Sequence, residues 1–248
     1  MSVSDENTAN AAGVNNWFEA THWSLVLVAG QNDSSKAQEA LASLCKAYWY
    51  PLYVFARRQG QGPEDAQDLV QGFFAKVIEK NYLAAAEREK GRFRSFLLVA
   101  LKRYMANEWD RAGRVKRGGG RELLSLDEQN TEMRYRAEPV DSMSPEKAFE
   151  RQWALTLLQQ VLDRLASEYS APAKAPLFEG LKIFLSGEKG ASYTEVGLKL
   201  GMTEGAVKVA VHRLRLRYRE LLRLEIANTV SSPDAIEDEI RNLFAALS

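Results

Sequence analysis

The sequence has almost no cysteine or histidine, and this limits the chemistry open to it. Cys45 is the only cysteine among 248 residues, so a disulfide framework is excluded and a reducing, cytoplasmic location is expected. His22 and His212 are the only histidines, too few for a histidine cluster that binds a metal. We therefore expect no metal site and no cofactor.

Long apolar runs and strand patterns are also missing. The longest apolar run near the start covers only residues 25–29, far too short to cross a bilayer. No leader pattern precedes it, so we expect no membrane partner. Alternating strand patterns are almost absent, which favours an all-α fold.

The common catalytic arrangements are missing too. The sequence has no nucleophile elbow, and its glycine-rich stretches at 118–120 and 187–190 lack the context of a nucleotide-binding loop. Asp65 and Asp68 form an acid pair, but no third ligand for a catalytic metal accompanies them. We therefore predict a binding protein with no catalytic residues, not an enzyme.

What the sequence does contain is charge sorted into blocks. Lysine plus arginine and aspartate plus glutamate both number 33, so the formal net charge is zero. Residues 88–121 nevertheless carry eleven basic residues against three acids, and residues 122–150 carry eight acids against three basic residues. A second basic block at 206–223 has six basic residues and one acid. Two basic blocks separated by an acidic one point to a polyanion partner.

The second basic block lies in a predicted helix-turn-helix at residues 192–223. Ser192 or Thr194 can cap a first helix, Gly201 can end it in a left-handed conformation, and Thr203 can cap the second helix. The second helix has an apolar stripe at Val207, Val211, Leu214, Tyr218 and Leu221. A basic helix after a glycine turn is typical of a helix that enters a DNA major groove.

Three helices are predicted earlier in the chain, at residues 36–58, 63–80 and 93–111. Pro51 should kink or split the first of them. Gly72, inside the second, costs about 1 kcal/mol relative to alanine. Either a neighbouring group approaches the backbone there, or the glycine is an uncompensated weak point.

The third of these helices combines basic and aromatic residues, the combination that binds single-stranded nucleic acid. Its core stripe is predicted from Phe93 to Met105. Trp109 and Phe93 could each be core residues or stacking surfaces. The predicted exposed face consists of Arg92, Arg94, Lys102, Arg103, Asn107 and Arg111.

We predict two helical domains joined by a flexible acidic linker, the second containing the helix-turn-helix. A disordered tail covers residues 1–20, the first domain 21–121, the linker 122–144 and the second domain 145–228. An acidic helical extension follows at 229–248. Its acids are candidates for masking the basic second helix of the helix-turn-helix.

Three motifs, in order along the chain, resemble those of extracytoplasmic-function sigma factors of bacterial RNA polymerase. Residues 65–74, DAQDLVQGFF, resemble the family's D-A-E-D-L-V-Q-E-T-F. Residues 93–97, FRSFL, resemble F-R-x-W-L, and residues 205–213, GAVKVAVHR, resemble the start of G-T-V-K-S-R-L-H-R-A-R. The resemblance covers roughly residues 36–117 and 145–224.

The resemblance implies a role for each motif. The first would bind the β′ clamp helices of the bacterial core polymerase through Asp65, Asp68, Leu69, Gln71 and Gly72. The second would open the promoter and hold its −10 element on Arg92, Phe93, Arg94, Lys102, Arg103, Asn107 and Arg111. The third would read the −35 element of promoter DNA with Thr203, Lys208, Val209, His212, Arg213, Arg215 and Arg217. An anti-sigma factor is a further candidate partner.

The sequence departs from the family pattern at several points. Lys102-Arg103 replaces the family's Arg-Asn pair, Gly72-Phe73 replaces Glu-Thr, and the loop at 81–91 is longer than usual. Two alternative functions stay open at this stage. One is a stand-alone helix-turn-helix regulator that works without polymerase, and the other is a nucleic-acid-processing enzyme that uses Asp65 and Asp68 with Mg²⁺.

Overall fold

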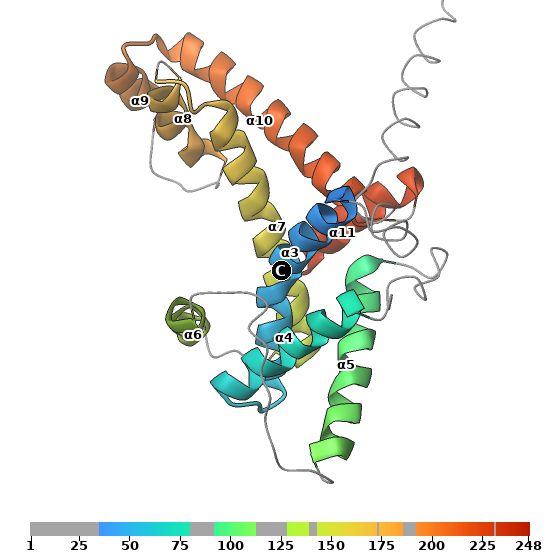
Figure 1. Cartoon of the computed structure of the whole chain (residues 1–248). Helices are drawn as coiled ribbons and strands as arrows, with labels where there is room; N and C mark the ends of the chain where they lie inside the picture. Colours follow the sequence, from blue (N-terminus) through green and yellow to red (C-terminus); the bar gives the residue numbers. More distant parts are fainter. Residues whose placement is uncertain are drawn as a thin grey trace, which may run out of the picture. The chain divides into compact units, whose positions relative to one another are not determined.

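The computed structural model describes residues 35–79, 92–112, 128–138, 143–172, 174–185, 192–230 and 232–248. Throughout these ranges the secondary structure is helical and no strand occurs, so the all-α prediction is confirmed (Figure 1). None of the helices in them is long and apolar enough to span a bilayer. The predicted tail at 1–20 and the loop at 81–91 lie outside the described residues.

The chain divides into two compact units. The first contains residues 1–156 and 226–248, and the second contains residues 157–225. Helix α7 (Pro145–Glu168) passes from the first unit into the second, and α10 (Glu204–Ala227) ends in the first.

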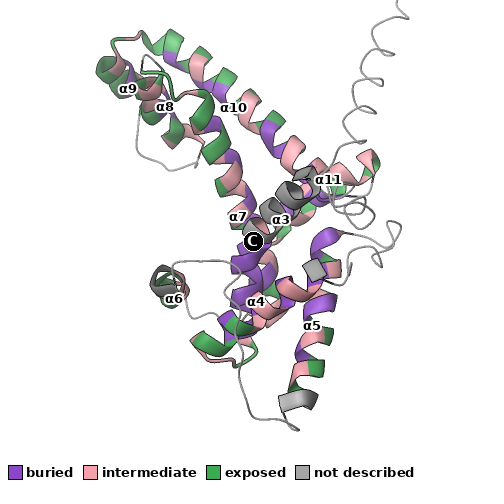
Figure 2. Cartoon of the chain, in the orientation of Figure 1, coloured by how far each residue is buried: buried purple, intermediate pink, exposed green. Residues whose placement is uncertain are grey.

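Three helices form the core of the first unit: α3 (Ser35–Arg58), α4 (Pro63–Glu79) and α5 (Phe93–Ala112). Helices α4 and α5 each turn an apolar stripe inward, so buried and exposed positions alternate along their ribbons (Figure 2). Helix α3 is buried on all sides from residue 48 to residue 56. Burial of each large apolar side chain contributes about 1.5–3 kcal/mol. The core residues include Leu52, Val54, Phe55, Val70, Phe73, Val77, Phe93, Leu97, Leu101 and Met105.

Helix α3 continues through Pro51 and is not split there, so that part of the prediction was wrong. Pro51 itself is buried, as are the residues on either side of it, from Tyr48 to Ala56. Tertiary packing on both sides of the proline therefore outweighs the loss of one backbone hydrogen bond.

Gly72 of α4 faces Tyr104 of α5. A Cβ atom on Gly72 would lie 2.5 Å from the Tyr104 hydroxyl oxygen, closer than such atoms can approach. The Tyr104 ring also lies 4.4 Å from the Lys76 ammonium and packs beside Phe73. The glycine therefore makes room for a neighbouring ring, the first of the two alternatives left open by the sequence.

The acidic linker is not an irregular segment throughout. Residues Glu128–Ala137 form helix α6, which hydrogen bonds to α3. Tyr53 donates to Glu132 at 2.5 Å, Arg57 pairs with Glu132 at 3.0 Å, and Tyr50 donates to Glu138. The sequence pattern missed this helix because its contacts are made by polar groups to a distant segment.

The C-terminal segment also belongs to the first unit. A 3₁₀ turn, η2 (Pro233–Ala235), leads into α11 (Ile236–Ala245). Leu243 and Glu239 of α11 are buried, as is Val230 before it. The Thr229 carbonyl accepts a hydrogen bond of 3.3 Å from the Phe93 amide at the start of α5.

The second unit contains the end of α7, α8 (Ala175–Leu181), the turn η1 (Lys182–Phe184), α9 (Tyr193–Leu200) and most of α10. Its core is made of Val161, Leu165, Phe178, Leu181, Val196, Val207, Val211, Leu214 and Leu221.

The predicted turn chemistry between α9 and α10 is confirmed. Ser192 and Glu195 form a reciprocal capping box at the start of α9, and Gly201 ends that helix with φ of 65°. The Thr203 hydroxyl accepts a hydrogen bond of 3.2 Å from the Ala206 amide at the start of α10. Local sequence therefore fixes where both helices begin and where the first one ends.

Candidate functional site

One edge of α4 is acidic and exposed. Glu64, Asp65 and Asp68 are exposed, while Leu69 and Gln71 beside them are half-buried. Glu64 and Asp65 lie in the first turn, where carboxylates are favoured by the free N–H groups of the helix. The opposite face is buried in the core, so this edge is available to a partner with basic or polar groups.

The outer face of α5 is both cationic and apolar. Arg103 and Asn107 are exposed along it, and so are Val99 (49%) and Trp109 (51%). Lys102 is exposed as well, although its ammonium lies 2.7 Å from a carboxylate oxygen of Glu146 in α7. Trp109 is therefore not a core residue, which excludes one of the two readings that the sequence left open. The side chain of Arg111 lies outside the described part of the chain.

The start of α5 is buried instead of open. Phe93 packs edge-on against Tyr48, with the ring centroids 5.1 Å apart, so it is a core residue. Arg94 is 1% exposed, and the expectation that it lies on the outer face was wrong. It comes three residues before Leu97 and seven before Leu101, which places it on the same buried stripe.

The Arg94 guanidinium has three partners, of which Glu239 and Trp153 are buried and Glu150 is half-buried. It pairs with Glu239 of α11, lies 3.4 Å from Glu150 of α7, and stacks over the Trp153 ring at 4.3 Å. Arg92, just before α5, lies 2.7 Å from Glu239 and keeps 40% of its side chain exposed. No local sequence pattern indicates Glu239 as a partner, because 145 residues separate it from Arg94.

The outer face of α10 contains the residues that the sequence predicts to contact DNA bases. Lys208, Val209, His212 and Arg213 are all exposed, and Thr203 is exposed at the start. Lys208 lies 2.6 Å from Glu204 one turn earlier, and this ion pair raises the pKa of Lys208 and lowers that of Glu204. Both charges stay at the surface, where a phosphate can displace the carboxylate at little cost.

Two arginines of α10 are held by the second unit itself. Arg215 donates to the Phe184 carbonyl at 2.9 Å. Arg217 pairs with Glu168 of α7 at 2.6 Å and with Glu220 at 2.8 Å, and these bonds raise its pKa. Arg217 therefore joins α10 to α7 in this structure, while Arg213 and Arg219 are exposed.

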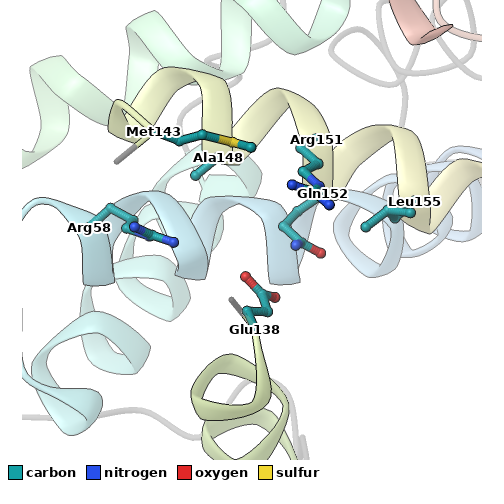
Figure 3. Close-up of a pocket in the computed structure, with 7 residues that line it drawn as sticks. All are labelled: Arg58, Glu138, Met143, Ala148, Arg151, Gln152 and Leu155. Carbon is teal, nitrogen blue, oxygen red and sulfur yellow. The ribbon is translucent and has the colours of Figure 1, made fainter. Parts of the chain in front are cut away.

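A small cavity in the first unit does not form a ligand site. It measures about 110 Å³ and is lined by Arg58, Glu138, Met143, Ala148, Arg151, Gln152 and Leu155 (Figure 3). Small-molecule sites usually measure about 300–1,000 Å³. Its Glu138 carboxylate is already bonded to Tyr50.

Comparison with known proteins identifies the family. A family model described as ECF sigma factor matches residues 34–223, which include α3 from its start, α4, α5, α9 and most of α10. The ECF RNA polymerase sigma factor SigE of Mycolicibacterium smegmatis is 26% identical over 205 residues, covering 81% of this chain and 69% of that protein. No solved structure matches the chain. The chain therefore belongs to the ECF sigma factor family, a family of transcription initiation factors and not a class of enzymes.

Proposed function

We propose that this chain binds bacterial core RNA polymerase and directs it to promoters, where it reads the −35 element and opens the −10 element. Family membership supports the sigma factor role. The observation that carries the rest is the exposure of three faces on helices inside the family match: the acidic edge of α4, the outer face of α5 and the outer face of α10.

The acidic edge of α4 is the proposed polymerase contact. Asp65 and Asp68 supply exposed carboxylates, and Leu69 and Gln71 supply half-buried contacts beside them. Gly72 contributes by keeping the Tyr104 ring close under this part of the helix. We propose the β′ clamp helices as the partner.

The outer face of α10 is the proposed −35 contact. Lys208, His212 and Arg213 are placed to meet base edges in the major groove, with Val209 between them and Thr203 at the helix start. Arg219 is suited to a phosphate, which positions the helix without reading sequence. Arg215 and Arg217 would first have to exchange their present partners for phosphates.

The outer face of α5 is the proposed −10 contact. Lys102, Arg103 and Asn107 would hold the phosphates and bases of the opened strand, and Trp109 offers a ring for an unstacked base. Capture of unstacked bases offsets an unstacking cost of a few kcal/mol per step. Arg94 and Phe93 are buried, so we assign them to supporting this face from the core and not to contacting the strand.

A binding assay with purified core polymerase tests the proposal. We expect the wild-type chain to bind saturably and Asp68→Lys to lose at least tenfold in affinity, because a cation replaces an exposed carboxylate on the contact edge. Glu179→Lys is the matched control, since it makes the same charge change at an exposed position of α8 in the second unit. Equal binding by wild type and Asp68→Lys would contradict the proposed contact.

A further inference from the structure

The segment after α10 lies beyond the family match, yet it is built into the first unit. Residues 224–248 follow the matched range. Within them, α11 buries Glu239 to 1% exposure, and Thr229 bonds to the first amide of α5. A buried carboxylate is uncommon unless it is paired, so its partners indicate what the segment does.

The partners of Glu239 are the two arginines at the start of α5. One oxygen accepts a hydrogen bond from Arg94, and the other lies 2.7 Å from Arg92 Nε. The second contact is an ion pair and not a hydrogen bond, because that oxygen has no aligned donor. With Glu150 beside Arg94, two arginines face two carboxylates and the cluster is neutral.

We propose that α11 is a carboxylate clasp that competes with a nucleic-acid phosphate for Arg92. The inference rests on the proposed function of α5 as the face that holds single-stranded DNA. Glu239 keeps Arg92 neutralised while DNA is absent, and α11 loosens from α5 when Arg92 turns to a phosphate.

Arg92 is the arginine that changes partner. Its side chain is 40% exposed and it precedes the helix, so a strand lying along α5 can reach it. Arg94 is 1% exposed and keeps Glu150 and the Trp153 ring when Glu239 moves. When Arg92 leaves Glu239 for a phosphate, its positive charge becomes available to DNA. The buried Arg94 still has partners.

The proposed competition can be measured through DNA affinity or through the attachment of α11. If a phosphate and Glu239 compete for Arg92, docking of α11 weakens DNA binding, and DNA binding weakens the docking of α11 by the same factor. Removal of the Glu239 charge should therefore strengthen DNA binding. If Glu239 has a purely structural role, DNA affinity and the attachment of α11 do not depend on each other.

The first experiment measures binding of a mixed-sequence single-stranded 12-mer to the full chain. We expect Glu239→Gln to bind several-fold more tightly than wild type at 50 mM salt. One extra phosphate contact steepens the salt dependence by about 0.7, so the gain shrinks by roughly 2.6-fold between 50 and 200 mM salt. In an Arg92→Ala background the same substitution should change nothing.

Asp238→Asn is the matched control. It removes the same charge from the adjacent position of α11, but Asp238 is exposed and pairs with Arg241 instead of α5. It should leave affinity near the wild-type value. Equal affinities for wild type and Glu239→Gln, or equal gains in both variants, would overturn the clasp.

A second experiment needs no variant. Amide hydrogen exchange of residues 236–245 in the wild-type chain should speed up when the 12-mer is bound, and unchanged or slower exchange would count against the clasp. Arg103→Ala separates the two proposals. If it weakens 12-mer binding while Glu239→Gln has no effect, α5 holds DNA as proposed and the clasp alone is wrong.

Discussion

Gly72 shows how one residue can look like a defect in sequence and prove to be a fitted contact. A glycine inside a helix loses about 0.5–1 kcal/mol relative to alanine. Here the missing side chain leaves room for the hydroxyl of Tyr104, which joins α4 to α5. The two helices that carry the proposed polymerase and −10 contacts are therefore held together at this point.

This fit predicts a change of sign in a double-mutant cycle. Gly72→Ala should destabilise the wild-type chain, because the new methyl group collides with the Tyr104 hydroxyl. In a Tyr104→Phe background the nearest ring atom is the Cζ, 3.6 Å away. There the same substitution should stabilise by about 0.5–1 kcal/mol. Urea denaturation measures all four variants, and equal effects in both backgrounds would rule out the contact.

The burial of Arg94 could not be predicted from its residue type alone. A charged residue was expected to face outward because charged side chains are rarely buried. Its position three residues before Leu97 already indicated the buried stripe. The groups that offset the cost of burying the Arg94 charge could not be predicted from the sequence. They are Glu150, Trp153 and Glu239, and they come from two other helices. Burial of an arginine becomes understandable only when those helices are in place.

Elements with local signals were predicted well, and elements held by distant contacts were not. The start of α9, its end at Gly201 and the start of α10 follow from caps and a left-handed glycine within a few residues. Helix α6 lies in a stretch with little apolar periodicity, and its attachment depends on α3. Helix α11 was predicted, as part of the acidic helical extension at 229–248, but no local pattern encodes its docking on α5.

The attachment of α6 should depend on pH through Glu132. Partial burial raises the pKa of Glu132, but hydrogen bonds from Tyr53, Arg136 and Arg57 lower it by more, so it lies below the ordinary value. A carboxylate with a lowered pKa adds stability above the unfolded-state pKa, about 4.3. That stability is lost as the pH falls through the lower, folded-state value.

Melting temperatures as a function of pH test this attachment. Wild type should melt above Glu132→Gln at pH 6, and the difference should close as the pH falls from about 5 to 3. Tyr53→Phe removes one of the three hydrogen bonds that lower the pKa of Glu132. Its loss of stability with falling pH should therefore be smaller and should be complete at a higher pH. A difference between wild type and Glu132→Gln that stays constant down to pH 3 would show that the Glu132 charge does not hold α6.

Across the chain, the proposed contacts divide between the two units. The α4 edge and the α5 face lie in the first unit, and the α10 face lies in the second. The family match covers all three faces but ends before α11. The proposed clasp is thus an addition to the family's shared part, and it acts on the unit that would hold the opened strand.

We propose that this chain gives core RNA polymerase a promoter preference. Transcription by purified core polymerase from a template library with randomised upstream DNA tests this preference. We predict that the chain enriches transcripts from templates with two separated conserved elements. Arg213→Ala should reduce the sequence preference at the upstream element alone. A bidentate base contact contributes about 1–3 kcal/mol of discrimination there. Arg219→Ala is the matched arginine control on α10. It should reduce transcription from all templates by the same factor. Transcription no greater and no more selective than that of core polymerase alone would rule out this function.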